Sequence, residues 1–236
     1  MPYPLKAFCA IVVFSIIHLF ADRTRKLEKF WHGAFLSACG GVSIAYVFID
    51  LLPKLSKSDQ LVRSTLIGVF PFLEKHVYIM ALGGFLFFFA IDRLQKSSKN
   101  NVGFVALTMS SYAFFNFLVG YAVVDKDNPE FQPLLLFTFA MGLHYFVNDY
   151  TLNEKHKTEY HDFGKALLIC SLFLGFLTGI LFQLSEVAIA LVSAFIGGGV
   201  IMNVIRHELP QEKPHSLTSF VAFSCLYAII LLSIGS

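Results

Sequence analysis

Eight long apolar segments alternate with short polar ones along the chain of 236 residues. They cover about residues 3–20, 33–52, 72–92, 102–124, 132–152, 165–184, 186–206 and 216–235. A helix needs roughly 17 to 25 apolar residues to cross about 30 Å of hydrocarbon. The strands of a β-barrel would instead be segments of about ten residues with alternating polarity. The pattern therefore predicts an all-α polytopic membrane protein with eight transmembrane helices.

The composition agrees with this prediction. Hydrophobic residues make up 56% of the chain and charged residues 14%, and 27 residues are Phe. A water-soluble domain of this composition would lack the polar residues to cover its surface. No run of Gly, Ser or Pro marks a linker, so residues 1–236 are expected to form a single transmembrane domain.

The basic residues are placed unevenly. Of the 18 Lys and Arg residues, 12 fall in every second connection, beginning with the one after the first apolar segment. By the positive-inside rule, both termini lie outside the cytoplasm. The connection from Lys54 to Lys75 departs from the rule, since it places four basic residues on the predicted outer side.

The first apolar segment has no strong basic leader and is followed by "ADRTRKLEK", the reverse of a signal peptide's charge order, so we expect it to be retained. A short chain without targeting extensions suits a bacterial inner membrane. The four cysteines, Cys9, Cys39, Cys170 and Cys225, lie in apolar segments without CxxC spacing and are expected to be packing residues. There is no HExxH motif, nucleophile elbow or phosphate loop, so an enzyme is not expected.

Two segments of similar sequence occur far apart. "GGVSIAYVFIDLLP" spans residues 40–53 and "GGGVIMNVIRHELP" spans 197–210, and their alignment pairs Asp50 with His207. They fall in the second and seventh helices, which cross the membrane in opposite directions. This arrangement predicts a 3+2+3 inverted repeat of the kind found in secondary transporters. Alternatively, Gly and Leu-Pro recur by chance in membrane helices, where both are common.

In either case, Leu-Pro is expected to end each of these helices at a membrane surface. Asp50 and His207 would then lie at opposite faces, where an ion enters or leaves. The alternative is that each side chain only reaches the interface from its helix end.

Polar residues occur at mid-depth in the fourth and fifth helices. Tyr112 and Asn116 form one i, i+4 pair, and His144 and Asn148 form another, so each pair shares a helix face. Polar groups are costly in hydrocarbon and usually face a partner, a cavity or a transport path. The alternative is a hydrogen bond that only holds two helices together. Asp149 is turned about 100° from Asn148 and is expected to point elsewhere.

The stretch "NEKHKTEYHD", residues 153–162, carries carboxylate and imidazole groups. Such groups could hold a divalent metal ion. A hydrated cytoplasmic loop of mixed charge explains the same residues equally well.

Three segments resemble the ZIP (Zrt/Irt-like) family of divalent-metal transporters. They are "GGVSIAYVFIDLLPKL" (40–55), "EKHVYIMALGGFLFFFAIDRL" (74–94) and "GGGVIMNVIRHELPQE" (197–212), which are similar to the family's second, third and seventh helices. The resemblance implies eight helices with both termini outside, a homodimer in the lipid bilayer and no nucleic-acid partner. It also implies that a divalent cation such as Zn²⁺ or Fe²⁺ is the transported substrate, with no permanently bound cofactor.

The family's metal site lies on helices four and five, in motifs of the type His-Ser-x-x-Glu-Gly and His-x-x-x-Glu. The matching positions here imply His144 as a metal ligand, Asn116 and Asn148 as oxygen donors, and Tyr112 as a gate or weak ligand. Both carboxylates of the family pattern are amides in this chain. The residues expected along the path by which an ion enters and leaves are Asp50, His207, Glu208 and Asp149.

Two functions follow as hypotheses. The first is a ZIP-like transporter that moves a divalent cation toward the cytoplasm, with helices one, four, five and six sliding as a unit against helices two, three, seven and eight. The second is a transport-inactive ZIP-like protein that serves as a structural subunit, a sensor or a carrier of a less charged solute. The missing carboxylates favour the second, because a dication in a low dielectric needs anionic ligands. The surviving polar residues favour the first.

Overall fold

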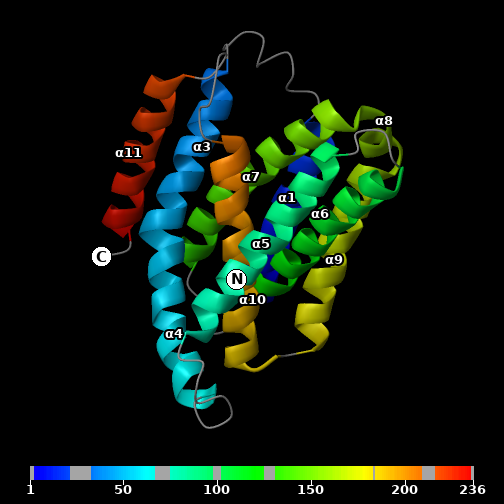
Figure 1. Cartoon of the computed structure of the whole chain (residues 1–236). Coiled ribbons are helices and arrows are strands. Elements are labelled where there is room, and N and C mark those ends of the chain that lie inside the picture. The colour runs from blue at the N-terminus through cyan, green and yellow to red at the C-terminus, as the bar shows by residue number, and fades with distance from the viewer. Residues whose placement is uncertain are drawn as a thin grey trace.

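A computed structural model describes residues 3–21, 33–66, 75–97, 102–124, 131–182, 184–208 and 216–234. Every regular element among them is a helix (Figure 1). In chain order the elements are α1 (Tyr3–Phe20), α3 (Ala34–Tyr46), η2 (Val47–Leu51), α4 (Leu52–Leu66), α5 (His76–Ser97), α6 (Val102–Ala122), α7 (Phe131–Lys155), α8 (Lys157–Glu159), η3 (Tyr160–Gly164), α9 (Lys165–Leu181), α10 (Glu186–Asn203), η4 (Val204–Glu208) and α11 (Leu217–Ile234). The elements labelled η are π-helical turns.

Seven helical stretches of the described chain are long and apolar enough to cross a membrane. The helix α7, with 25 residues, is also long, but it is not among the seven, because polar residues such as His144, Asn148 and Asp149 interrupt its apolar sequence. These same side chains are buried. The fold is therefore that of an all-α, multi-pass membrane protein with a polar helix enclosed by apolar ones.

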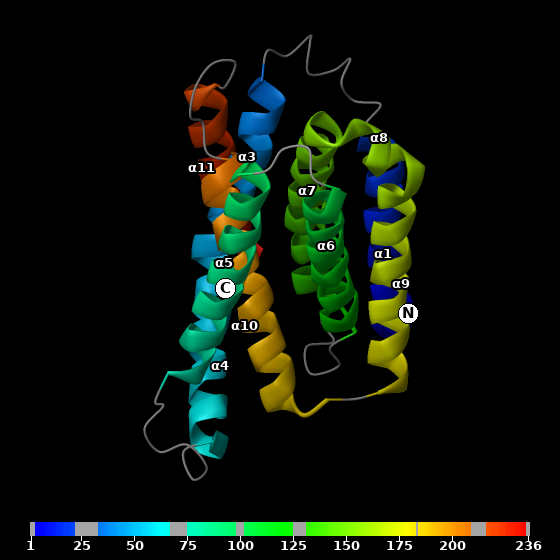
Figure 2. The same ribbon diagram turned by 45° about the vertical axis from the view of Figure 1, so that its right-hand side comes forward.

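The helices divide into two groups, which Figure 2 shows side by side. The first group holds α1, α6, α7 and α9, and the second holds α3 with α4, α5, α10 and α11. Within the groups, α6 packs along α9, α5 along α10, and α3 along α11. Contacts of α3 with α7 and of α6 with α5 and α10 join the groups. Any site between α7 and α10 is therefore formed where the two groups meet.

The second apolar segment does not end at Leu-Pro, and this part of the prediction is wrong. The helix continues through α3, η2 and α4 to Leu66, so Lys54, Lys57 and Arg63 lie on a helix rather than in a loop. In η2 the amide of Leu52 donates to the carbonyl of Val47, five residues earlier. Proline lacks an N–H and clashes with the preceding turn of an α-helix. A widened π turn directly before Pro53 lets the helix pass this residue.

The two similar sequence segments share local geometry. Val47–Leu51 and Val204–Glu208 are both π-helical and occupy the same aligned positions. The aligned glycines Gly41 and Gly198 are both sites of close helix crossing. A Cβ atom at Gly41 would overlap the Phe220 carbonyl of α11, and one at Gly198 would overlap the Ala81 carbonyl of α5. Each copy thus contacts its neighbouring helix through the same glycine.

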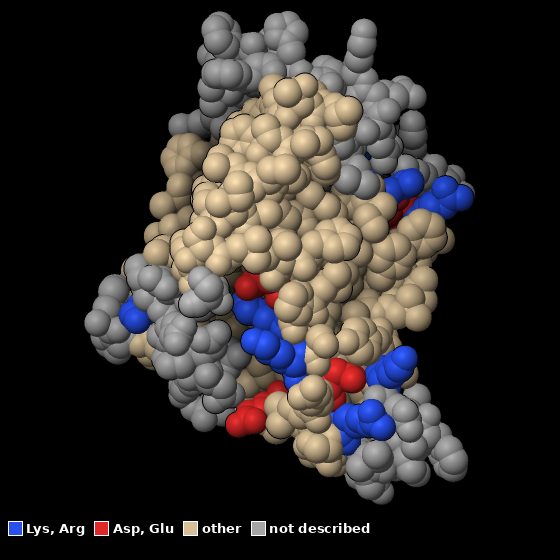
Figure 3. Space-filling model, turned by 90° about the vertical axis from the view of Figure 1, so that its left-hand side faces the viewer, with Lys and Arg blue, Asp and Glu red and all other residues tan. Residues whose placement is uncertain are grey.

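Large apolar side chains cover much of the exterior. On α11, Leu217, Ile229 and Leu232 are each more than 60% exposed. In Figure 3 a broad area of the visible face, in its upper middle, shows no charged atoms among the described residues, whereas Lys, Arg, Asp and Glu atoms gather below it and at its right-hand edge. Apolar surface of this extent is expected where lipid, rather than water, is the solvent.

Candidate functional site

Two faces of α7 carry buried polar side chains. His144 and Asn148 lie on one face, and Tyr145 and Asp149 lie on the next. His144, Asn148 and Asp149 are at most 4% exposed, and Tyr145 is fully buried. Consecutive helical residues are turned by about 100°, so the two faces meet different neighbours. The first face meets α10 and the second meets α1.

The first face forms a polar cluster with Asn203, the last residue of α10. The Asn203 amide nitrogen donates to the Asn148 side-chain oxygen and lies 3.5 Å from Nε2 of His144. Asn203 directly precedes the π turn η4. The cluster therefore bridges the two helix groups at the point where α10 changes its helical geometry.

This cluster lines a pocket between α5, α6, α7 and α10. Its polar lining side chains are Asp92, Thr108, Ser111, Tyr112, His144, Asn148 and Asn203, and its apolar side includes Phe88, Phe115 and Met202. About 30 Å³ is accessible to the centre of a water-sized sphere. A single water needs roughly 10 to 15 Å³ on this measure, so the pocket suits a water molecule or a small ion rather than a bulky solute.

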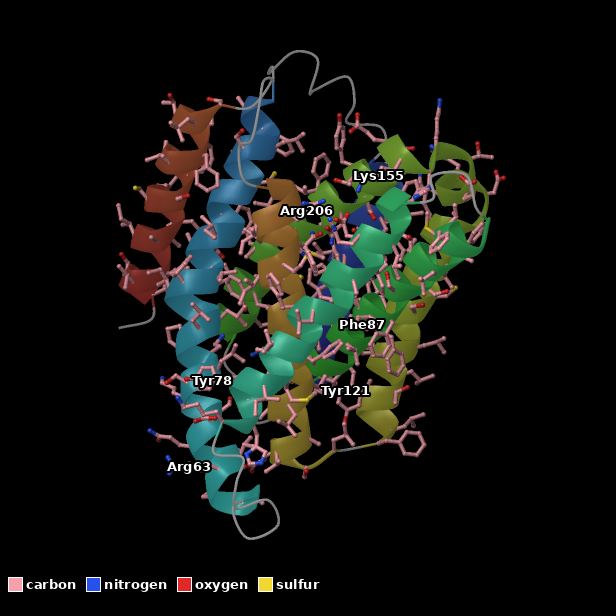
Figure 4. All side chains as sticks on the ribbon, viewed as in Figure 1. Arg63, Tyr78, Phe87, Tyr121, Lys155 and Arg206 are labelled. Atoms are coloured by element: carbon pink, nitrogen blue, oxygen red, sulfur yellow. The ribbon has the colours of Figure 1, made fainter. Side chains whose placement is uncertain are left out.

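The carboxylate of Asp92 in this pocket is already paired. Its Oδ2 atom lies 2.7 Å from Nε of Arg206, and its Oδ1 atom lies 3.8 Å from Nζ of Lys155. Asp92 belongs to α5, Arg206 to η4 and Lys155 to α7. Lys155 and Arg206 both lie in the upper part of the molecule in Figure 4, whereas Arg63 lies at the opposite end. The three side chains tie the two helix groups together at one mouth of the pocket and neutralise its carboxylate.

The second face of α7 meets His18 of α1, which is fully buried. Nδ1 of His18 lies 2.7 Å from Asp149 Oδ2, and Nε2 lies 2.9 Å from the Asn116 side-chain oxygen. The Asn116 amide nitrogen donates to the Tyr112 carbonyl at 2.9 Å, which directs the Asn116 oxygen to the imidazole. This network joins α1, α6 and α7 within one helix group.

The structure separates the residues predicted to form one site. His144, Asn148 and Tyr112 line the pocket, whereas Asn116 turns to His18 and Asp149 pairs with it. Asp50 lies elsewhere, on η2, with its carboxylate 2.8 Å from Lys54. His207 and Glu208 belong to η4, but their side chains lie outside the described residues.

Three contributing residues escaped the prediction: His18, Asp92 and Asn203. Each lies in an apolar segment, and a polar residue in such a segment is itself a signal. The spacing within one helix could not reveal them, because each has its partners on a different helix.

The metal-binding capacity of the pocket is limited. In the described part of the chain, no three His, Cys, Asp or Glu side chains lie close enough to share a metal ion. The pocket offers one imidazole, amide and hydroxyl oxygens, and a carboxylate paired with Arg206. Such a set can coordinate a cation, but it supplies little net negative charge to replace the lost hydration.

The chain was compared with family models, curated proteins and solved structures, and none of them matches it.

Proposed function

We propose that this chain is a ZIP-like membrane transporter that moves a divalent metal cation, such as Zn²⁺ or Fe²⁺, toward the cytoplasm. The observation that carries the proposal is the small pocket of His144, Asn148 and Asn203 between two helix groups. Transporters place their sites at the interface of such groups, where a relative movement exposes the site to one side and then the other.

A second cavity supports access from both sides. On α6, Phe115 lines the pocket and Val119, one turn further along, lines the second cavity. On α10, Gly199 lines the pocket and the next residue, Val200, lines the second cavity. Phe115, Val119 and Val200 belong to one buried hydrophobic cluster. The two openings are therefore separated by a thin apolar layer, an arrangement that suits alternating access.

The proposed orientation follows from the basic residues. The mouth with Asp92, Arg206 and Lys155 would face the cytoplasm, the termini would face outward, and the membrane would be a bacterial inner membrane. A homodimer built through the group of α3, α5, α10 and α11 belongs to the same proposal. The sliding movement of α1, α6, α7 and α9 as a unit fits the two groups of Figure 2.

The second candidate function is a carrier of a less charged solute, or a transport-inactive subunit. The pairing of Asp92 with Arg206 favours it, because this pocket carboxylate is already neutralised. A dication bound beside Arg206 and Lys155 would also meet like charge. The two functions differ in what the purified protein transports.

The test is uptake of Zn²⁺, Fe²⁺, Mn²⁺ and Cd²⁺ into proteoliposomes. We expect uptake by the unaltered protein and its loss in His144→Ala. His161→Ala is the matched control, since His161 is exposed on η3 and does not line the pocket. If no dication enters faster than into empty liposomes, the cation proposal is wrong and the second candidate stands.

A further inference from the structure

The second cavity, which is larger than the pocket of His144, lies on the other side of the apolar layer, among α1, α3, η2, α4, α6, α7 and α10. About 340 Å³ is accessible to the centre of a water-sized sphere, a volume within the range of small-molecule sites. Its polar lining residues are Tyr3, Tyr46, Lys54, Lys57, Ser58 and Ser193. This cavity has room for a molecule much larger than a metal ion.

Two lysines enter this cavity from the helix that passes Pro53. Leu51, Lys54, Leu55 and Ser58 all line the cavity, and their spacing of i, i+3, i+4 and i+7 places them on one helix face. Lys57 flanks this face and lines the cavity as well. The continuation of the helix beyond Leu-Pro is therefore what positions the basic residues.

The charge in the cavity is positive. None of the described lining residues is an Asp or Glu. Lys54 pairs with Asp50 at 2.8 Å, but Lys57 makes no ion pair with any residue that the structure describes. A cleft lined by one sign of charge with apolar walls concentrates ions of the opposite sign. The cavity therefore concentrates anions.

The remaining wall is apolar. Val119, Leu134, Phe137, Met141 and Ile196 are among its lining residues. A lining that combines hydroxyl and ammonium groups with aliphatic and aromatic groups matches a ligand with a charged head and an apolar body. An inorganic anion would use only half of this lining.

We propose that this cavity binds an organic anion with one carboxylate or phosphate group and a short apolar body. Lys57 and Lys54 would bind the anionic group, with Ser58 and Ser193 as hydrogen-bond donors. The same chemistry is offered by a soluble organic acid and by an anionic lipid that enters from the bilayer. The site accounts for basic residues on the predicted outer side, and it goes beyond the proposed metal transport without depending on it.

The test is calorimetric titration of the full chain in phosphatidylcholine nanodiscs with sodium hexanoate, hexanamide and inorganic phosphate. We expect hexanoate to bind and hexanamide to bind at least about tenfold more weakly, because the amide lacks the charge. Phosphate binding as tight as that of hexanoate would contradict a role for the apolar wall. Absence of hexanoate binding in these nanodiscs overturns the proposal.

A second set of nanodiscs, which contain phosphatidylglycerol, distinguishes the two sources. Unchanged hexanoate affinity there indicates a soluble acid as the ligand. Loss of hexanoate binding indicates that the lipid headgroup occupies the cavity. Both results support an anion site.

The variants localise the binding. Lys57→Gln should weaken hexanoate binding about tenfold, and Lys54→Gln/Lys57→Gln should weaken it further. Because the Lys57 side chain is exposed and makes no ion pair within the described ranges, the single substitution is not expected to disturb folding. The matched control is Arg63→Gln/Lys75→Gln, which removes two positive charges from residues outside the lining. Equal weakening in the control would show that only the overall charge matters, and would overturn the site.

Discussion

His18 of α1 and Asp149 of α7 form a buried pair, with 2.7 Å between Nδ1 and Oδ2. Neither side chain is more than 1% exposed. A buried charged pair contributes little relative to two apolar residues, but the removal of one partner leaves the other unpaired in a low dielectric. The pair therefore constrains which substitutions α1 and α7 tolerate.

We predict that Asp149→Ala lowers the free energy of unfolding by about 3 to 5 kcal/mol. The double variant His18→Leu/Asp149→Leu should cost less than this, because it leaves no unpaired polar partner. Both can be measured by detergent-induced unfolding in mixed micelles. Tyr150→Phe is the control, since it removes an exposed hydrogen bond to Glu154 and leaves the buried pair intact. A double variant less stable than the single one would contradict the explanation.

We predict that Asn148→Asp increases the affinity for Zn²⁺ in the uptake assay by about tenfold, because an opposite charge within about 4 to 6 Å favours the charged species by at least roughly this factor. The substitution keeps the shape of the side chain and the acceptor oxygen for Asn203. Asn153→Asp makes the same chemical change on α7 outside the pocket lining and should have little effect. If Asn148→Asp reduces Zn²⁺ uptake, a less charged substrate becomes the better hypothesis.

The ion pair of Asp92 and Arg206 predicts opposite effects on cation uptake when one or the other residue is substituted. Arg206→Gln should improve cation uptake at low concentration, because it leaves the Asp92 carboxylate without its partner at 2.7 Å. Asp92→Asn should impair uptake, because Arg206 and Lys155 would then stand uncompensated at the mouth. Initial uptake rates over a range of Zn²⁺ concentrations provide the measurement. A change of the same sign in both variants would indicate a purely structural role.

The close crossing of α10 and α5 gives a prediction for glycine. A Cβ atom at Gly198 would overlap the backbone of Ala81, so Gly198→Ala should destabilise the protein by about 1 to 3 kcal/mol. Gly83→Ala on α5 is the matched control, because nothing lies within 4 Å of its added Cβ. The control should be neutral or stabilising by up to about 1 kcal/mol, since alanine favours the helix. The melting temperatures of the two variants are the measurement. A loss of stability in Gly198→Ala alone would show that the close helix packing, and not the helix propensity of alanine, determines the effect.

His156, between α7 and α8, gives a pH dependence. Burial lowers the pKa of this imidazole below its usual value of 6.5, and Lys155 acts in the same direction while Glu159 opposes it. Between the lowered pKa and about 6.5 the unfolded chain therefore binds more protons than the folded one, so stability rises with pH there. Above about pH 6.5 His156 is neutral in both states and does not lower the free energy of unfolding. As the pH falls through this window, protonation of the unfolded chain lowers that free energy.

The measurement is the melting temperature from pH 5 to 8 for the unaltered protein and for His156→Gln. The decline below pH 6.5 should be smaller in the variant. Identical pH profiles would show that His156 does not contribute to it.

The sequence predicts the helices well because length and hydropathy decide which segments can cross a bilayer. It predicts less well where a helix ends. The rule that proline ends a helix fails at Pro53, because the π turn η2 precedes it and lets the chain continue to Leu66. Because of that extension, Lys54 and Lys57 lie on a helix and line a cavity, whereas the sequence predicted them in a loop.

The candidate site was predictable only within single helices. The spacing of His144 and Asn148 correctly places both on one face, and the turn of 100° separates Asp149 from them. The partners His18 and Asn203 depend on how α1 and α10 pack against α7. No local pattern encodes that packing. A polar residue in an apolar segment shows that a partner exists, but not which one.

The π turns Val47–Leu51 and Val204–Glu208 begin at the same aligned position. A π turn contains one residue more than the α turn around it needs, so it behaves as an inserted residue within a helix. If the two copies descend from one ancestral half, that extra residue was present before the gene duplicated. On that history, both halves would have kept it, while the residues around it changed to Asp50 in one and His207 in the other.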